Sequence, residues 1–291
     1  MKDMSIVIKG AGEMASGIAH RLFQAGMTRI CMIEIENPLC VRRTVSFCEA
    51  LFEQQVEVEG VVGTRVNDRE ELDEAWECNQ IGVMVDPAWK MIAALKPDVV
   101  VDAILAKQNL GTGKDEAPVV IGVGPGFSAP DVVHAVIESN RGRNLGRTIF
   151  SGAAERFTGI PASRAGFSWE RVIRAPHAGK VRLVKCIGDI VKTGDVILNV
   201  NSTPVRAEMD GVLRGLIREI EVGENEKVGD VEPTRDPSCC WKISDKARAI
   251  GDGVLEAVRN LTSQEIGTKT GKGVKQWMLS ARYVKNSEIR V

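Results

Sequence analysis

The chain has 291 residues, of which 44% are hydrophobic and 26% are charged, and its formal net charge at pH 7 is −1. This length allows a full hydrophobic core and favours two domains over one. The balanced charge provides no electrostatic attraction for nucleic acid, and no basic run indicates a membrane surface. No stretch reaches the roughly 18 apolar residues of a membrane span, and the chain enters a strand too soon for a signal peptide. We therefore expect a cytoplasmic protein that binds neither nucleic acid nor membrane.

The most specific motif is a glycine-rich turn near the N-terminus. An apolar strand at 5–9 leads into Gly10-Ala11-Gly12-Glu13-Met14-Ala15, a G-x-G-x-x-A pattern that opens a helix. In nucleotide-binding folds the first glycine permits the tight turn, the second admits a pyrophosphate, and the alanine keeps the helix close to the strand. The pattern predicts a nucleotide site formed by Gly10, Gly12, Glu13, Met14 and Ala15. A tight turn without a ligand is the alternative.

Charged residues after the second strand extend this candidate site. The strand at 29–33 ends in Glu34, near the place of a ribose-binding carboxylate, and Glu36 is a competing acid. A helix expected from about 40 to 53 carries Arg42 and Arg43 in its first turn. Because that end of a helix is already positive, two arginines there indicate a bound anion. Solvated surface arginines are the alternative.

Strands and helices then alternate, which predicts a doubly wound parallel sheet. The expected elements are a β-rich stretch at 56–66, a helix at 68–76, a strand at 81–85, a helix at 89–95, strands at 98–103 and 119–121, and a helix that starts near residue 128. Ligands of such sheets lie beyond the carboxyl ends of the strands. Five more residues at that edge therefore join the candidate site: Asp102, Lys107, Gly124, Gly126 and Phe127.

The cysteines provide no framework for the fold. There are seven, an odd number, and they form neither a C-x-x-C motif nor a cluster with histidines. This pattern argues against a disulfide scaffold and against a structural zinc site. We predict no metal site, and no residue is assigned a catalytic role.

An internal repeat marks a second region. Alanine and glycine four residues apart, followed by a Lys-x-Gly-Asp-Val turn, occur at 175–196 and again at 207–231. Repeated hairpin turns of this kind predict two similar halves around a pseudo-twofold, like the barrel-sandwich of biotinyl and lipoyl carrier domains. The hairpin at 199–206 lacks the lysine to which those carriers attach their cofactor. We therefore expect neither biotin nor lipoate.

Beyond this region an apolar stripe at 247–258 predicts a helix that needs a packing partner. The small barrel is a poor host for it, so we expect the helix to return to the first domain. The predicted organisation is a Rossmann-like nucleotide-binding domain (1–165), a barrel-sandwich β domain without attachment lysine (166–240), the returning helix (241–261) and an unassigned segment (262–291).

Several of these segments together resemble the YqeB-type selenium-dependent molybdenum hydroxylase system proteins. The segments are the turn at 10–17, Glu36-Asn37-Pro38, Arg42-Arg43-Thr44-Val45, the stretch at 101–107, Gly124-Pro125-Gly126-Phe127, and 244–251. The resemblance covers about residues 4–260, and the Arg-Arg segment is also similar to accessory proteins of xanthine dehydrogenase maturation. One departure is Arg143, where the family pattern leads us to expect histidine.

The resemblance implies an accessory or maturation role for molybdenum hydroxylases that carry selenium. The implied partners are a nucleotide-containing small molecule and a molybdenum hydroxylase apoenzyme. The dinucleotide form of the molybdenum cofactor fits the glycine turn, and NAD(P) fits it equally well. An NAD(P)-dependent oxidoreductase is therefore the first alternative, and a non-enzymatic docking module is the second. Whether the protein is an enzyme stays open at this point.

Overall fold

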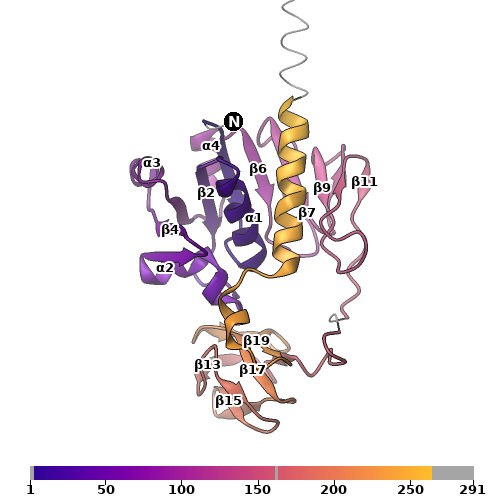
Figure 1. The fold of residues 1–291 in the computed structure, drawn as a ribbon. Helices are drawn as coiled ribbons and strands as arrows, with labels where there is room; N and C mark the ends of the chain where they lie inside the picture. The colour runs from indigo at the N-terminus through magenta and orange to yellow at the C-terminus, as the bar shows by residue number, and fades with distance from the viewer. Residues whose placement is uncertain (1–2, 161–162, 264–291) are drawn as a thin grey trace, which may run out of the picture.

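The computed structural model describes residues 3–160 and 163–263. A large mixed sheet forms the main body, and two small antiparallel sheets lie below it in Figure 1. The strand order of the large sheet is β10-β9-β7-β6-β1-β2-β5-β4-β3. Its strands are β1 (Ser5–Lys9), β2 (Arg29–Glu34), β3 (Gln55–Val58), β4 (Val61–Arg65), β5 (Ile81–Val85), β6 (Val99–Asp102), β7 (Val119–Val123), β9 (Ala135–Ile137) and β10 (Thr148–Ile149).

The prediction of a Rossmann-like, doubly wound parallel sheet is corrected by this topology. Strands β3 and β10, at the two edges, pair antiparallel with their neighbours, so the sheet is mixed. Helices α1 (Glu13–Gln24), α3 (Arg69–Glu77) and α4 (Lys90–Leu95) connect strands in the first half. The connections at 103–118 and 124–134 contain no helix. Glycines with positive φ, among them Gly111, Gly124 and Gly126, interrupt both connections.

Two expected helices are replaced by shorter elements. The segment at 40–53 forms two 3-10 turns, η1 (Arg43–Val45) and η2 (Phe47–Glu49), and only then the short α2 (Ala50–Glu53). The amide of Cys48 donates to the carbonyl oxygen of Ala11, which draws this segment onto the glycine turn. The helix expected near residue 128 is instead the short strand β8 (Ser128–Ala129), paired with β11 (Gly152–Ala153).

Side chains of the sheet alternate between two hydrophobic clusters, as strand geometry requires. Ile6 and Ile8 of β1 pack with α1 on one face, whereas Val7 packs on the other face with residues of α3 and α4. Residues 245–263 form a helix that lies beside α1 in Figure 1 and contributes Ile250, Val254 and Val258 to the first cluster. The helix contact is close, because a Cβ at Gly17 would lie 2.7 Å from Cβ of Ala247. The domain boundaries given above stay a prediction.

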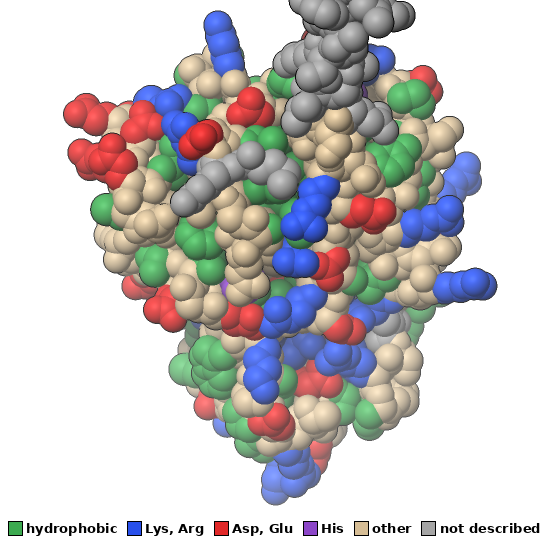
Figure 2. All heavy atoms as spheres, turned by 45° about the horizontal axis from the view of Figure 1, so that its top comes forward, with side chains coloured by type: hydrophobic (Ala, Val, Ile, Leu, Met, Phe, Trp, Pro, Cys, Tyr) green, Lys and Arg blue, Asp and Glu red, His purple; other side chains and the backbone are tan. Residues whose placement is uncertain are grey.

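The surface over these helices carries mixed charge. Figure 2 shows a band of basic side chains down one face with acidic side chains beside it. Two ion pairs bridge elements in this way, Arg21 with Asp252 at 2.5 Å and Arg248 with Glu59 at 2.6 Å. No helix within 3–160 and 163–263 is long and apolar enough to cross a membrane.

The second region is corrected as well, from one barrel-sandwich to two four-stranded antiparallel sheets. Their orders are β12-β19-β17-β14 and β16-β15-β13-β18, so each combines strands from both copies of the repeat. The Gly-Asp turns specify hairpins, as where Asp195 accepts a hydrogen bond from the amide of Lys192, but not how the hairpins pair. The strands are β12 (Val172–Arg174), β13 (Gly179–Leu183), β14 (Ile190–Val191), β15 (Val196–Val200), β16 (Thr203–Arg206), β17 (Gly211–Leu216), β18 (Glu221–Val222) and β19 (Lys227–Glu232), followed by η3 (Pro237–Trp241).

Candidate functional site

A pocket of about 440 Å³ lies where the carboxyl ends of β1, β2 and β6 face the antiparallel sheets. It brings together six of the predicted site residues: Gly10, Gly12, Glu13, Met14, Glu34 and Arg42. The remaining lining comes from the loop after β2, the loop after β6 and the start of β19: Ile35, Pro38, Leu39, Cys40, Val41, Ala103, Ile104, Leu105, Glu226 and Lys227. We call it the turn pocket.

The glycine turn forms the floor of this pocket. Gly10 has φ +95°, and its amide donates to the carbonyl oxygen of Ile33 at 2.8 Å. Gly12 is the N-cap of α1 and forms no side-chain cap, and a Cβ placed there meets no atom within 4 Å. The first turn of a helix has amide donors without intrahelical acceptors, and it is the positive end of the helix dipole. Ala15, in contrast, is buried in the core.

Glu34 closes the turn from the side. Its two carboxylate oxygens accept hydrogen bonds from the amides of Ala11 and Ile35, both at 2.8 Å. Burial raises the pKa of Glu34, although both hydrogen bonds act to lower it. The carboxylate is therefore bonded to the main chain of its own turn. The competing acid Glu36 is exposed and does not line the pocket.

The two arginines bind main-chain carbonyl oxygens. Arg42 is 4% exposed and donates to the carbonyl oxygens of Arg214, Cys239 and Lys242 at 2.8–3.4 Å. Arg43 donates to the carbonyl oxygen of Leu216 at 2.7 Å. Both side chains therefore fasten the antiparallel sheets to the main body.

Arg42 also lies close to Glu13, and both residues line the turn pocket. Its Nε lies 3.5 Å from Oε1 of Glu13, and both atoms are buried. Neither atom forms a hydrogen bond within the part of the chain that the structure describes. The pair thus compensates charge but leaves an acceptor and a donor unused.

The other predicted residues lie outside the turn pocket and hold loops together. Oδ2 of Asp102 accepts from Oγ1 of Thr112 at 2.6 Å, and Nζ of Lys107 lies 4.3 Å from the ring centre of Phe157. The three predicted site residues in the second glycine turn, Gly124, Gly126 and Phe127, pack tightly against the rest of the protein. A Cβ at Gly126, for example, would lie 2.7 Å from the amide nitrogen of Asn109. This turn is therefore filled by protein.

Glu226 and Lys227 close the turn pocket from the antiparallel sheets and were not predicted from the sequence. Nζ of Lys227 bonds Oδ1 of Asp230 at 3.2 Å. Their only sequence signal is their place at the second copy of the repeat.

Lys246, at the start of the helix 245–263, is half-buried, and burial lowers its pKa. Among residues 3–160 and 163–263, no group of three or more His, Cys, Asp or Glu side chains is arranged to hold a metal ion.

Comparison with known proteins identifies one close relative. No family model matches the chain. It is 47% identical over 270 residues to the uncharacterized protein YqeB of Escherichia coli (strain K12), which is 92% of this chain and 49% of that protein. The chain thus spans about half the length of this curated relative.

The solved structures that resemble the chain do so weakly. An aspartoacylase family protein from Mesorhizobium loti is 14% identical, with 79% of this chain and 85% of that chain covered, at a TM-score of 0.25. A succinylglutamate desuccinylase from a Silicibacter species is 12% identical, with coverage of 78% and 84% and a TM-score of 0.24.

The function predicted from the sequence is corrected. The matching structures carry the names of succinylglutamate desuccinylases and aspartoacylases, not of molybdenum hydroxylase maturation factors or oxidoreductases. The contacts of the two arginines also count against a dinucleotide, because Arg42 and Arg43 donate to main-chain carbonyl oxygens and are not free to bind its phosphates. The maturation role and the oxidoreductase alternative are therefore withdrawn. Over the 270 residues that align, the chain is a YqeB-type sequence, as its motifs had predicted.

Proposed function

We propose that the protein binds a small polar molecule in the turn pocket. The observation that carries this proposal is Oε1 of Glu13, a buried carboxylate oxygen on the pocket wall that accepts no hydrogen bond from any described residue. An unsatisfied buried acceptor costs about 1–3 kcal/mol, which a ligand that donates a hydrogen bond would recover. The volume of about 440 Å³ is in the range of small-molecule sites.

The charges around the pocket suggest the chemistry of the ligand. Glu13 calls for a hydroxyl or ammonium group as donor. The first amides of α1 favour an anionic group nearby. The facing wall carries one charge of each sign, on Lys227 and Glu226. A molecule with both features, such as an amino acid or a hydroxy acid, matches the two walls best.

Thermal stabilisation of purified protein tests the proposal. The compounds are amino acids and hydroxy acids, with simple carboxylic acids and simple amines as half-matched comparisons. We expect stabilisation by compounds that carry both groups, since a ligand at 100 times its Kd adds about 2.7 kcal/mol. Gly12→Ala should abolish it, because the added Cβ enters open space in the pocket at an ordinary φ of −72°. Glu13→Gln should weaken it strongly by removing the charge.

The matched control is Glu70→Gln, which changes an exposed glutamate on α3 in the same way. This variant should respond to the compounds as the unchanged protein does. Stabilisation that survives both Gly12→Ala and Glu13→Gln would place the ligand elsewhere. If no compound with both groups stabilises the protein, the proposal is wrong.

A further inference from the structure

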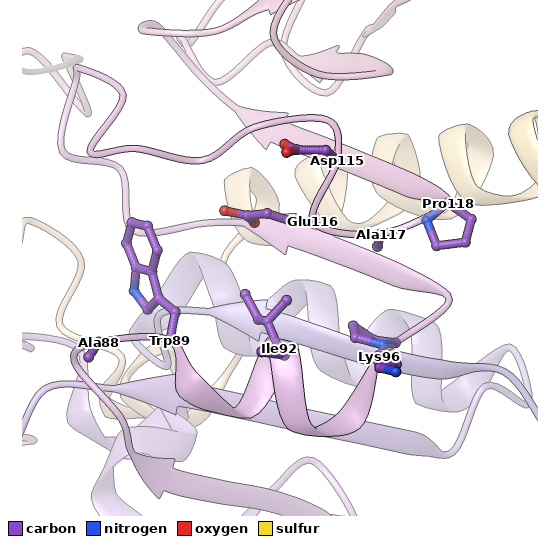
Figure 3. Close-up of a pocket in the computed structure, with 10 residues that line it drawn as sticks. Ala88, Trp89, Ile92, Lys96, Asp115, Glu116, Ala117 and Pro118 are labelled. Atoms are coloured by element: carbon purple, nitrogen blue, oxygen red, sulfur yellow. The ribbon is translucent and has the colours of Figure 1, made fainter.

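A second hollow, of about 900 Å³, lies on the opposite face of the mixed sheet. It runs between α4 and residues 115–118, as Figure 3 shows, and shares no lining residue with the turn pocket. The hollow exists because the connection from β6 to β7 contains no helix to cover this part of the sheet. We call it the α4 groove.

A buried lysine stands behind one end of the α4 groove. Lys9, the last residue of β1, is 0% exposed. Its Nζ donates to Oγ1 of Thr112 at 2.7 Å and to Oε1 of Glu116 at 2.8 Å, and it lies 3.4 Å from the ring centre of Trp89. An ammonium group has three hydrogens, so these three contacts use all of them.

Glu116 keeps one oxygen unused. Thr112 passes its own hydrogen to Asp102, at 2.6 Å, and therefore cannot donate to Glu116. Oε2 of Glu116 is buried and accepts no hydrogen bond from the residues that the structure describes. Figure 3 shows the carboxylate of Glu116 on the side of the groove where Trp89 stands. The network is thus complete except for one acceptor at the groove wall.

The charges at this end sum to a negative value. Asp102 and Glu116 are two carboxylates against the single ammonium of Lys9, and the exposed Asp115 adds a third carboxylate on the same wall. A carboxylate next to an indole ring favours a cation. The other end of the groove, on the right in Figure 3, carries Lys96.

We propose that the α4 groove binds a primary alkylamine in its ammonium form. The charged head lies beside Glu116 and Trp89, and the hydrocarbon chain runs along the apolar side chains of Ile92, Pro97 and Pro118. Lys96 repels a second cation at the far end. A monoamine therefore binds better than a diamine of the same length.

Calorimetric titration of the full chain with 1-hexylamine, 1-hexanol and 1,6-diaminohexane tests this. At pH 7 the amines are protonated, because alkylammonium groups titrate near pH 10. We expect hexylammonium to bind about ten-fold more tightly than hexanol, which corresponds to about 1.4 kcal/mol, and more tightly than the diamine. Glu116→Gln keeps an oxygen for Lys9 but removes the charge, and it should abolish the preference for the amine over the alcohol.

Two neighbouring alanines of α4 provide a matched pair that leaves the lysine network untouched. Ala93 is exposed and lines the α4 groove, whereas Ala94 is exposed and does not. Ala93→Trp should block hexylammonium, and Ala94→Trp should not. Equal affinity for the amine and the alcohol, or unchanged binding in Ala93→Trp, would overturn the proposal even if Glu116→Gln failed to fold.

Discussion

At the scale of single residues, two buried charged side chains, Lys9 and Arg42, hold distant segments of the chain together by hydrogen bonds. Lys9 connects the end of β1 to the segment at 112–116 and to Trp89 after β5. Arg42 connects the segment after β2 to three carbonyl oxygens from β17 to residue 242. Each side chain supplies several hydrogen bonds to polar groups in loops, where these groups do not pair with one another as they would in a helix or a sheet. These positions therefore tolerate substitution poorly.

We expect Lys9→Met to destabilise the protein by about 3 kcal/mol, because it leaves the part-buried carboxylate of Glu116 and the buried carboxylate of Asp102 without the nearby ammonium group. The free energy of unfolding in urea measures this. Lys90→Met is the control, since Lys90 is exposed on α4, and such a surface change should stay within about 0.5 kcal/mol. A Lys9→Met variant as stable as the Lys90→Met variant would contradict this role of Lys9.

At the scale of elements, α3 is a helix that local signals predicted. In α3, the side chain of Asp68 accepts a hydrogen bond from the amide of Glu71 at 3.0 Å, and the carboxylate of Glu71 accepts one from the amide of Asn67 at 2.7 Å. This arrangement is a variant of the capping box, in which the glutamate would bond the amide of the N-cap residue itself. The segment at 40–53 has apolar spacing but no such cap. Its main chain bonds to Ala11 instead, and that partner is invisible to a local pattern.

Asp245, the first residue of the helix at 245–263, should make the stability of the protein depend on pH. A hydrogen bond from Arg141 lowers the pKa of the Asp245 carboxyl to about 2. Since this value is below that of an unfolded chain, about 3.9, the stability from Asp245 is present above pH 4 or so and is lost as the pH falls toward 2. The difference in unfolding free energy between the unchanged protein and Asp245→Asn should therefore shrink over that range. A difference that stays constant down to pH 2 would show that the carboxyl is not held by Arg141.

At the scale of the whole molecule, the site depends on contacts between distant parts of the chain. The glycine turn and its helix follow from residues 5–24 and were predicted. The hydrogen bonds of Glu34 and Arg42 could not be predicted, because their partners are main-chain atoms that only the folded chain brings near. The same holds for Glu226 and Lys227. Strand pairing at both edges of the sheet likewise has no local signature.

Arg42→Met tests the attachment of the antiparallel sheets. We expect faster amide hydrogen exchange in β17 and at 239–242, because the carbonyl oxygens of these segments lose a charged donor. The amides of β1 and β2 should keep their protection. Arg143→Met, at an exposed arginine, serves as the control. Unchanged exchange in Arg42→Met would mean that other contacts hold the two regions together.

The late position of the helix at 245–263 has a consequence for synthesis on the ribosome. This helix covers the face of a sheet whose last strand, β10, ends at Ile149. At about 5–20 residues per second, the ribosome needs roughly 5–20 s to make the intervening hundred or so residues. During that interval the nascent sheet presents Ile137 and its neighbours to solvent or to a chaperone. Slow decoding of the antiparallel region would lengthen this exposure and so raise the risk of aggregation before release.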